Sequence, residues 1–179
     1  MMIKRIKVKM DIIEMMLYYW QSTAEKEKVG ESFLREIADV PEMKYIYDDE
    51  FSGESVRKVL SAISNRELLN NSTKKERKFW NNNMWMLEDL EFMNMMVSPV
   101  KTLNLDSLLE RLNEKESKYE ALEVVFIPGH ENEYTIDENK LIINFFKITV
   151  DLYEEGKVTI AGKPFKEYIE EKLIELISQ

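Results

Sequence analysis

The run Leu-Glu-Val-Val-Phe-Ile at residues 122–127 constrains the fold of this chain more than any other segment. β-Branched and aromatic residues predominate in it, and Pro128 and Gly129 follow at once, which is the pattern of a strand ended by a turn. A strand needs hydrogen-bonding neighbours, so the chain must form a sheet. Residues 100–105 supply a second candidate strand, and Asp106 can cap a short helix between the two. Strand, helix and strand at this spacing predict one βαβ unit with parallel strands.

The first half of the chain has the periodicity of helices. Apolar residues recur at helical spacing over residues 11–28, 31–40 and 52–65. Basic residues that alternate with apolar ones over residues 5–10 predict an edge strand protected by lysine. We therefore expect a single domain over residues 1–179 of class α+β (or α/β), with a helical N-terminal half packed on a small mixed sheet.

Residues 140–155 fit two patterns. Their apolar side chains form a stripe at helical spacing, whereas those of residues 146–152 also alternate as in a strand. The length of this segment, its lack of a turn signal and the Gly156 that follows it favour a helix. A short strand at residues 158–161 and a terminal helix from Pro164 complete the expected order.

Charge and composition exclude several classes of function. The chain has 25 basic and 34 acidic residues and a net charge of −9, which repels nucleic acid and anionic membranes. It has no cysteine, so disulfides, thiolate nucleophiles and cysteine zinc sites are excluded. No apolar run approaches the roughly 20 residues that cross a bilayer. We expect a cytoplasmic protein without a membrane or nucleic-acid partner.

His130 is the only histidine, and its ordinary pKa lies near neutrality. The predicted βαβ unit brings the carboxyl ends of its strands to one edge, which places Asp106 near His130, Glu131 and Glu133. His130 would act there as a general base or metal ligand, oriented by one of these carboxylates. The alternative is that the Pro-Gly-His-Glu-Asn-Glu segment is only a solvated turn. Because there is no second histidine, no metal or cofactor is expected.

A segment rich in tryptophan, methionine and acidic residues is the second candidate. Tryptophan and methionine form adaptable binding surfaces, and acidic neighbours would select a basic partner. The alternative, that these side chains fill the core, is the commoner fate of large apolar residues. Three successive asparagines leave the surface and the core interpretations open, because buried amides need hydrogen-bond partners. Asparagine is also a poor helix former, so we expect the helix to break there unless it is buried on most sides. The candidate binding residues are Trp80, Asn82, Trp85, Glu88, Asp89 and, at the strand edge, Asn104.

Three classes of function follow from these features. The acidity, and the lack of a phosphate-binding loop or nucleophile elbow, favour a non-enzymatic inhibitor or immunity-type module that binds a basic protein partner. The second class is a small enzyme or ligand-binding protein that uses the strand-end site at His130. The third is a structural subunit that forms a homo-oligomer through its apolar segment.

Overall fold

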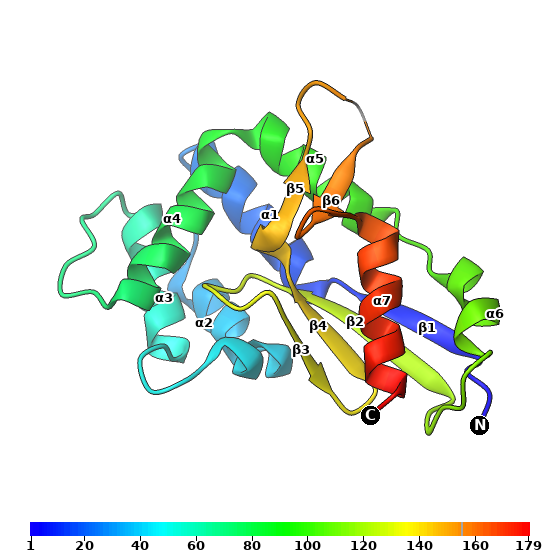
Figure 1. Ribbon diagram of the computed structural model, residues 1–179. Helices are drawn as coiled ribbons and strands as arrows, with labels where there is room; N and C mark the ends of the chain where they lie inside the picture. Colours follow the sequence, from blue (N-terminus) through cyan, green and yellow to red (C-terminus); the bar gives the residue numbers. More distant parts are fainter. Residues whose placement is uncertain (155) are drawn as a thin grey trace.

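A computed structural model describes residues 1–154 and 156–179 and shows the predicted mixed α+β fold (Figure 1). Within these residues, the main sheet has the strand order β1-β2-β4-β3. Strands β1, β2 and β4 are parallel, and β3 pairs antiparallel with β4. The strand predicted near the N-terminus is confirmed as the edge strand β1. The bounds are β1 (Arg5–Lys9), β2 (Ala121–Ile127), β3 (Tyr134–Asp137) and β4 (Lys140–Asn144).

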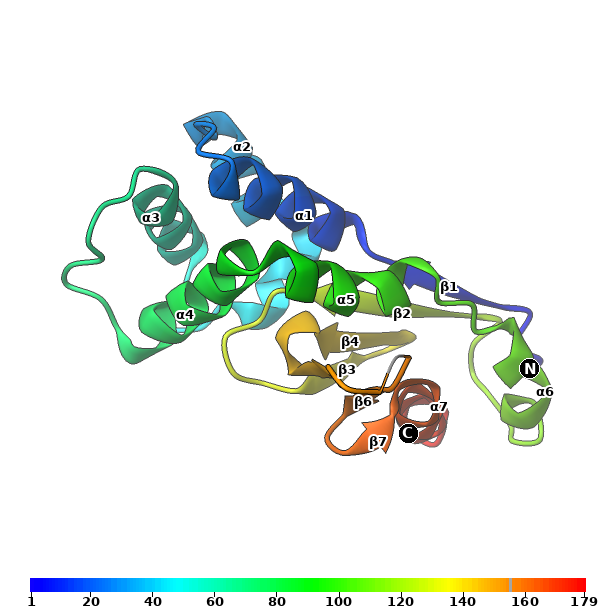
Figure 2. The same cartoon turned by 90° about the horizontal axis from the view of Figure 1, so that it is seen from above.

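Helices cover both faces of this sheet. Figure 2 shows the strands between α1 on one side and α7 on the other. The buried side chains of both halves of the chain form one continuous core. The connection from β1 to β2 contains α1 (Asp11–Ala24), α2 (Glu31–Asp39), the 3₁₀ helix η1 (Pro41–Ile46), α3 (Gly53–Ser64), α4 (Lys74–Glu88), α5 (Leu90–Lys101), η2 (Asp106–Leu108) and α6 (Leu109–Leu112), and α7 (Phe165–Ile177) ends the chain.

The strand predicted at residues 100–105 is wrong. Val100 and Lys101 complete α5, and the chain then runs without a strand to η2. The helix prevails because Met93, Met96, Val97 and Val100 are all buried at helical spacing. Strand β2 has its parallel neighbours in β1 and β4 instead, so the parallel pair joined by helices is β1 and β2.

The helix favoured for residues 140–155 does not form over residues 140–154, and residue 155 lies outside the described residues. Leu141, Ile142 and Ile143 form a continuous apolar run that is buried in β4 between β2 and β3. A strand buried on both faces has no polar alternation, which is why its pattern resembled that of a helix. A 3₁₀ turn, η3 (Phe145–Lys147), then leads into a second small sheet of β5 (Ile148–Val150), β6 (Val158–Ile160) and β7 (Lys163–Pro164).

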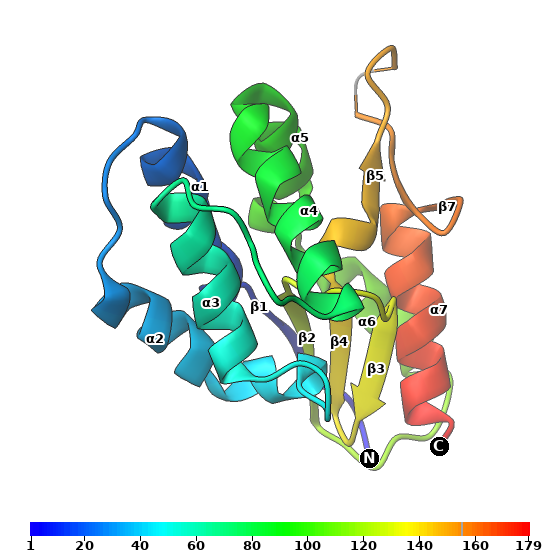
Figure 3. The same cartoon turned by 90° about the vertical axis from the view of Figure 1, so that its left-hand side faces the viewer.

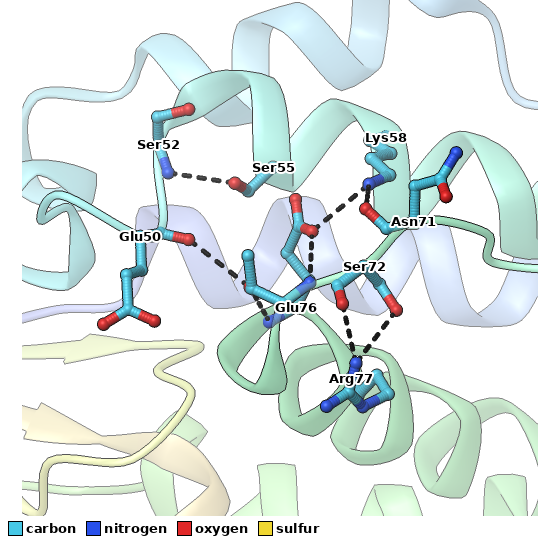
Figure 4. A network of polar contacts seen from close by, with 9 residues as sticks. Glu50, Ser52, Ser55, Lys58, Asn71, Ser72, Glu76 and Arg77 are labelled. Carbon is cyan, nitrogen blue, oxygen red and sulfur yellow. Dashed lines mark hydrogen bonds and ion pairs between the residues drawn. The ribbon is translucent and has the colours of Figure 1, made fainter.

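A polar network around the buried Glu76 fixes the start of α4 (Figure 4). The Thr73 hydroxyl accepts a hydrogen bond from the Glu76 backbone N–H, and a Glu76 carboxylate oxygen accepts one from the Thr73 N–H at 2.9 Å. The same oxygen lies 3.2 Å from the Lys58 ammonium of α3. Burial alone would raise the pKa of Glu76, but the Thr73 N–H, the Ser55 hydroxyl and Lys58 together lower it. Helix α4 is therefore firmly oriented against α3.

Candidate functional site

A pocket of about 130 Å³ lies at the carboxyl ends of β2 and β4. Because these strands are parallel neighbours, the segments that follow them meet at one edge of the sheet, where α/β proteins commonly bind ligands. Gly129 and His130 reach the pocket after β2, and Asn144 reaches it at the end of β4. Residues at the end of η1 form another wall. The lining includes the apolar and aromatic side chains of Tyr45, Tyr47, Ile127, Tyr134 and Ile142 and the polar side chains of Asp48, Glu131, Asn132 and Thr135.

His130 is buried in this pocket wall with one defined hydrogen bond. Its side chain is 8% exposed, and its ring centroid lies 4.6 Å from that of Phe51. Nε2 lies 2.9 Å from the carbonyl oxygen of Ile46. A carbonyl oxygen only accepts, so Nε2 carries a proton, and in the neutral form of the ring Nδ1 is an acceptor. Within the described residues, Nδ1 is buried without a hydrogen-bond partner.

Asn144 presents the complementary group. Its side-chain oxygen accepts hydrogen bonds from the backbone N–H of Gly129 at 3.1 Å and of Phe146 at 3.0 Å. These two bonds fix the orientation of the amide and leave its NH₂ group as a donor. The residue is 3% exposed, and in the part of the chain that the structure describes its Nδ2 atom is buried without a partner. Asn144 and His130 thus place an unused donor and an unused acceptor around one pocket.

Gly129 allows the two strand ends to approach so closely. A Cβ atom at this position would lie 2.7 Å from the Asn144 Nδ2 atom, closer than carbon and nitrogen can approach without displacement. On the other side, the Asn82 amide of α4 lies 3.4 Å from the Gly129 carbonyl oxygen. The turn after β2 is therefore held between β4 and α4.

Two carboxylates at the rim are paired with lysines of α4. The Lys75 ammonium lies 2.6 Å from Asp48, and the Lys78 ammonium lies 2.8 Å from Glu131. The hydrogen bond from Lys75 holds the pKa of Asp48 below its usual range, and Lys78 does the same for the pKa of Glu131. Both carboxylates are therefore ionised and already paired at neutral pH, so the rim does not require a charged ligand.

The structure does not bring Asn104 and Asp106 to His130. The side chain of Asn104 accepts a hydrogen bond from the backbone of Asp106 just before α6. Asn113, immediately after α6, bonds to the backbone of Ile3, which precedes β1. Figures 1 and 2 show α6 at the end of the sheet opposite the segment that follows β2. The proposed grouping depended on the strand at 100–105, which does not form.

The two glutamates next to His130 in the sequence have other partners. Glu131 pairs with Lys78, and Glu133 accepts a hydrogen bond from the Tyr168 hydroxyl at 2.8 Å. The contact that orients the His130 ring comes instead from the Ile46 carbonyl oxygen. A catalytic role for His130 with either glutamate stays a prediction.

The aromatic segment divides between core and surface. Helix α4 is continuous through the three asparagines. Trp85 is 60% exposed and stacks on Phe92 with a centroid distance of 5.6 Å, whereas Trp80 is half-buried. Glu88 and Asp89 are exposed, and Asp89 caps α5 by accepting a hydrogen bond from the Phe92 N–H.

Two other kinds of site are absent from residues 1–154 and 156–179. No three acidic or histidine side chains in this part of the chain lie close enough to hold a metal ion. No helix there combines the length and apolarity needed to cross a bilayer. Comparison of the chain with known protein families, with curated proteins and with solved structures finds no match.

Asn144 is the site residue that the sequence did not reveal. It directly follows the apolar run of residues 141–143, as Pro128 and Gly129 follow the run of residues 122–127. If both runs are taken as parallel strands, Asn144 and His130 fall at the same sheet edge. The preference for a helix over residues 140–155 concealed this relationship.

Proposed function

We propose that the protein binds a small neutral ligand in the pocket between the ends of β2 and β4. The observation that carries this proposal is the pair of buried, unpartnered polar groups, His130 Nδ1 and Asn144 Nδ2, on residues that line the same pocket. A buried polar group without a partner costs about 1–3 kcal/mol. A ligand that satisfies both groups recovers this cost on binding.

The chemistry of the two groups defines the ligand. His130 Nδ1 accepts, so the ligand supplies an N–H or O–H donor; Asn144 donates, so the ligand supplies an oxygen or nitrogen acceptor. The edge of a lactam carries both, because its N–H donor and its oxygen acceptor are attached to the same carbonyl carbon. A cavity of about 150 Å³ in another protein admits benzene, so a pocket of this size holds roughly one small ring. Tyrosine and isoleucine side chains suit the apolar part of such a ring.

Both polar atoms belong to residues that line the pocket, but each atom has less than 1 Å² exposed. Contact with a ligand therefore requires small rotations of the His130 ring or the Asn144 amide, a change that is common on binding. The interpretation of the protein as an acidic inhibitor of a basic partner stays a prediction. It depends on the acidity, the lack of catalytic motifs and the tryptophan- and methionine-rich segment, whereas the pocket offers groups of defined polarity.

The test uses 2-pyrrolidinone as a probe with an amide edge and N-methyl-2-pyrrolidinone as its control without the N–H donor. In ¹H–¹⁵N NMR titrations, we expect 2-pyrrolidinone to shift the Gly129 amide and the Asn144 side-chain signals saturably. The N-methyl compound should bind at least about fivefold more weakly, because it cannot donate to His130.

Two variants make the test specific. Gly129→Ala should abolish binding, because the new Cβ displaces the Asn144 amide. Gly30→Ala is the matched control, since a Cβ at Gly30 meets only Ser32 at an ordinary distance of 3.9 Å. Equal binding of the two probes, or the absence of saturable shifts at these signals, would contradict the proposal.

A further inference from the structure

The exposed side chains of α4 change from basic to acidic along the helix. Lys74 and Arg77 are exposed in its first half, and Glu88 is exposed at its end. No ion pair engages any of these three side chains within the described residues. Acidic residues near the N-terminus and basic residues near the C-terminus stabilise an isolated helix. This face has the reverse order, so the stability of α4 does not account for it.

An apolar pocket and a protruding indole lie on the same helix. The pocket has a volume of about 320 Å³ and is lined by Leu68, Leu69 and Trp80, with Arg77 and Asn81 beside them. Leu68 is 85% exposed. Five residues after Trp80 along the same helix, Trp85 is 60% exposed. Figure 3 shows α4 beside α3, with the connection of residues 65–73 running between them.

We propose that this face of α4 is the contact surface of a homodimer in which the two α4 helices pack antiparallel across a two-fold axis. The register that sets Arg77 opposite the partner's Glu88 also sets Trp80 opposite the partner's Trp85. Both pairs lie within α4, so they follow from one register of the two helices. Each contact then occurs twice, as a two-fold interface requires.

A second copy of the chain is the occupant that matches this face best. A basic partner would complement only the acidic end of α4 and would meet Lys74 and Arg77 at the other end. The same face turned by 180° complements both ends at once. It also brings an exposed tryptophan, a residue type favoured as an interface anchor, to the leucine-lined pocket of the other protomer. This proposal does not depend on the His130 pocket.

The experiment is sedimentation equilibrium from about 1 to 500 µM with charge-reversal variants. We expect the wild-type protein to form a dimer. Arg77→Glu places two acidic side chains opposite each other at both ends of the interface, and Glu88→Arg does the same with two basic ones. Each variant should therefore raise the dissociation constant of the homodimer at least about tenfold. Mixing the two variants should restore a dimer, because the Glu at position 77 then faces the Arg at position 88, and the native Arg77 of the second variant faces the native Glu88 of the first.

Several controls keep the test decisive. Arg35→Glu makes the same charge change on the exposed surface of α2 and should leave the dimer intact. Both α4 variants place charges in the order that favours the helix, so circular dichroism should show them folded. Trp85→Ala should also weaken the dimer. A monomeric wild-type protein over the whole range, or a dimer unaffected by all three α4 variants, would overturn the proposal, as would mixed variants that do not associate.

Discussion

The indole N–H of Trp20 in α1 donates a hydrogen bond to the side-chain oxygen of Asn83 in α4, with 2.9 Å between the two atoms. The Asn83 amide in turn donates to the Phe79 carbonyl oxygen at 2.8 Å. Both Trp20 and Asn83 are fully buried. One of the three asparagines therefore hydrogen-bonds α4 to α1 inside the core, and the helix does not break there.

Replacing Asn83 should destabilise the protein more than replacing its neighbour. Asn83→Ala leaves the buried Trp20 N–H without an acceptor and should lower the free energy of unfolding by about 1–3 kcal/mol. Asn81→Ala removes the same amide group from the exposed side of α4 and should change the free energy of unfolding by no more than about 0.5 kcal/mol. Urea denaturation measures both. Equal losses of unfolding free energy in the two variants would show that the hydrogen bond to Trp20 contributes nothing to stability.

Gly129 and Asn144 should be energetically coupled. Gly129→Ala forces a Cβ atom against the Asn144 amide and should cost about 1–3 kcal/mol through overpacking. The same substitution in an Asn144→Ala background meets no amide and should cost less, so the two changes should be non-additive in a double-mutant cycle. Additive losses would mean that the two residues are not in contact as described.

The buried Glu76 should make stability depend on pH in the acid range. Its pKa is lower in the folded protein than in the unfolded chain, where it takes its ordinary value. The unfolded chain therefore binds the proton first as pH falls. The contribution of Glu76 is fully present above the ordinary pKa and is lost as pH falls through the lower, folded value.

This sign is checked by urea midpoints of the wild-type protein and of Glu76→Gln between about pH 6 and pH 3. We expect Glu76→Gln to be less stable than wild type at pH 6, with the difference shrinking toward pH 3. A difference that stays constant, or that grows as pH falls, would show that the Lys58 and Thr73 contacts do not stabilise the ionised form.

Much of the fold followed from periodicity. The helices expected over residues 31–40 and 52–65 both form, because apolar stripes at helical spacing are local signals. The alternation over residues 5–10 correctly indicated a protected edge strand. These features depend on residues close together in the chain, which a sequence displays directly.

The failures arose where the deciding contacts are distant in sequence. Residues 140–144 become a strand because β2, far earlier in the chain, offers a parallel partner and both faces are covered. The sequence anticipated His130 at the end of a strand, where the structure has a pocket. It also predicted Asp106 beside His130, which the structure does not show. Residues 100–101 complete a helix whose buried stripe begins before Val97, so the strand that would have brought Asp106 there does not form. Asn144 was missed because a helix was favoured over residues 140–155, where the structure has the end of β4. Local pattern cannot choose between a buried strand and a buried helix.

The central claim is that His130 holds its proton on Nε2 and offers Nδ1 to a ligand donor. As the chain has a single histidine, ¹⁵N NMR of the imidazole reports on it without ambiguity. We predict that Nε2 resonates as a protonated, pyrrole-type nitrogen and Nδ1 as an unprotonated, pyridine-type nitrogen. The Nδ1 signal should move saturably toward the hydrogen-bonded position as 2-pyrrolidinone is added. A proton on Nδ1, or an Nδ1 signal that does not respond to the probe, would contradict the account.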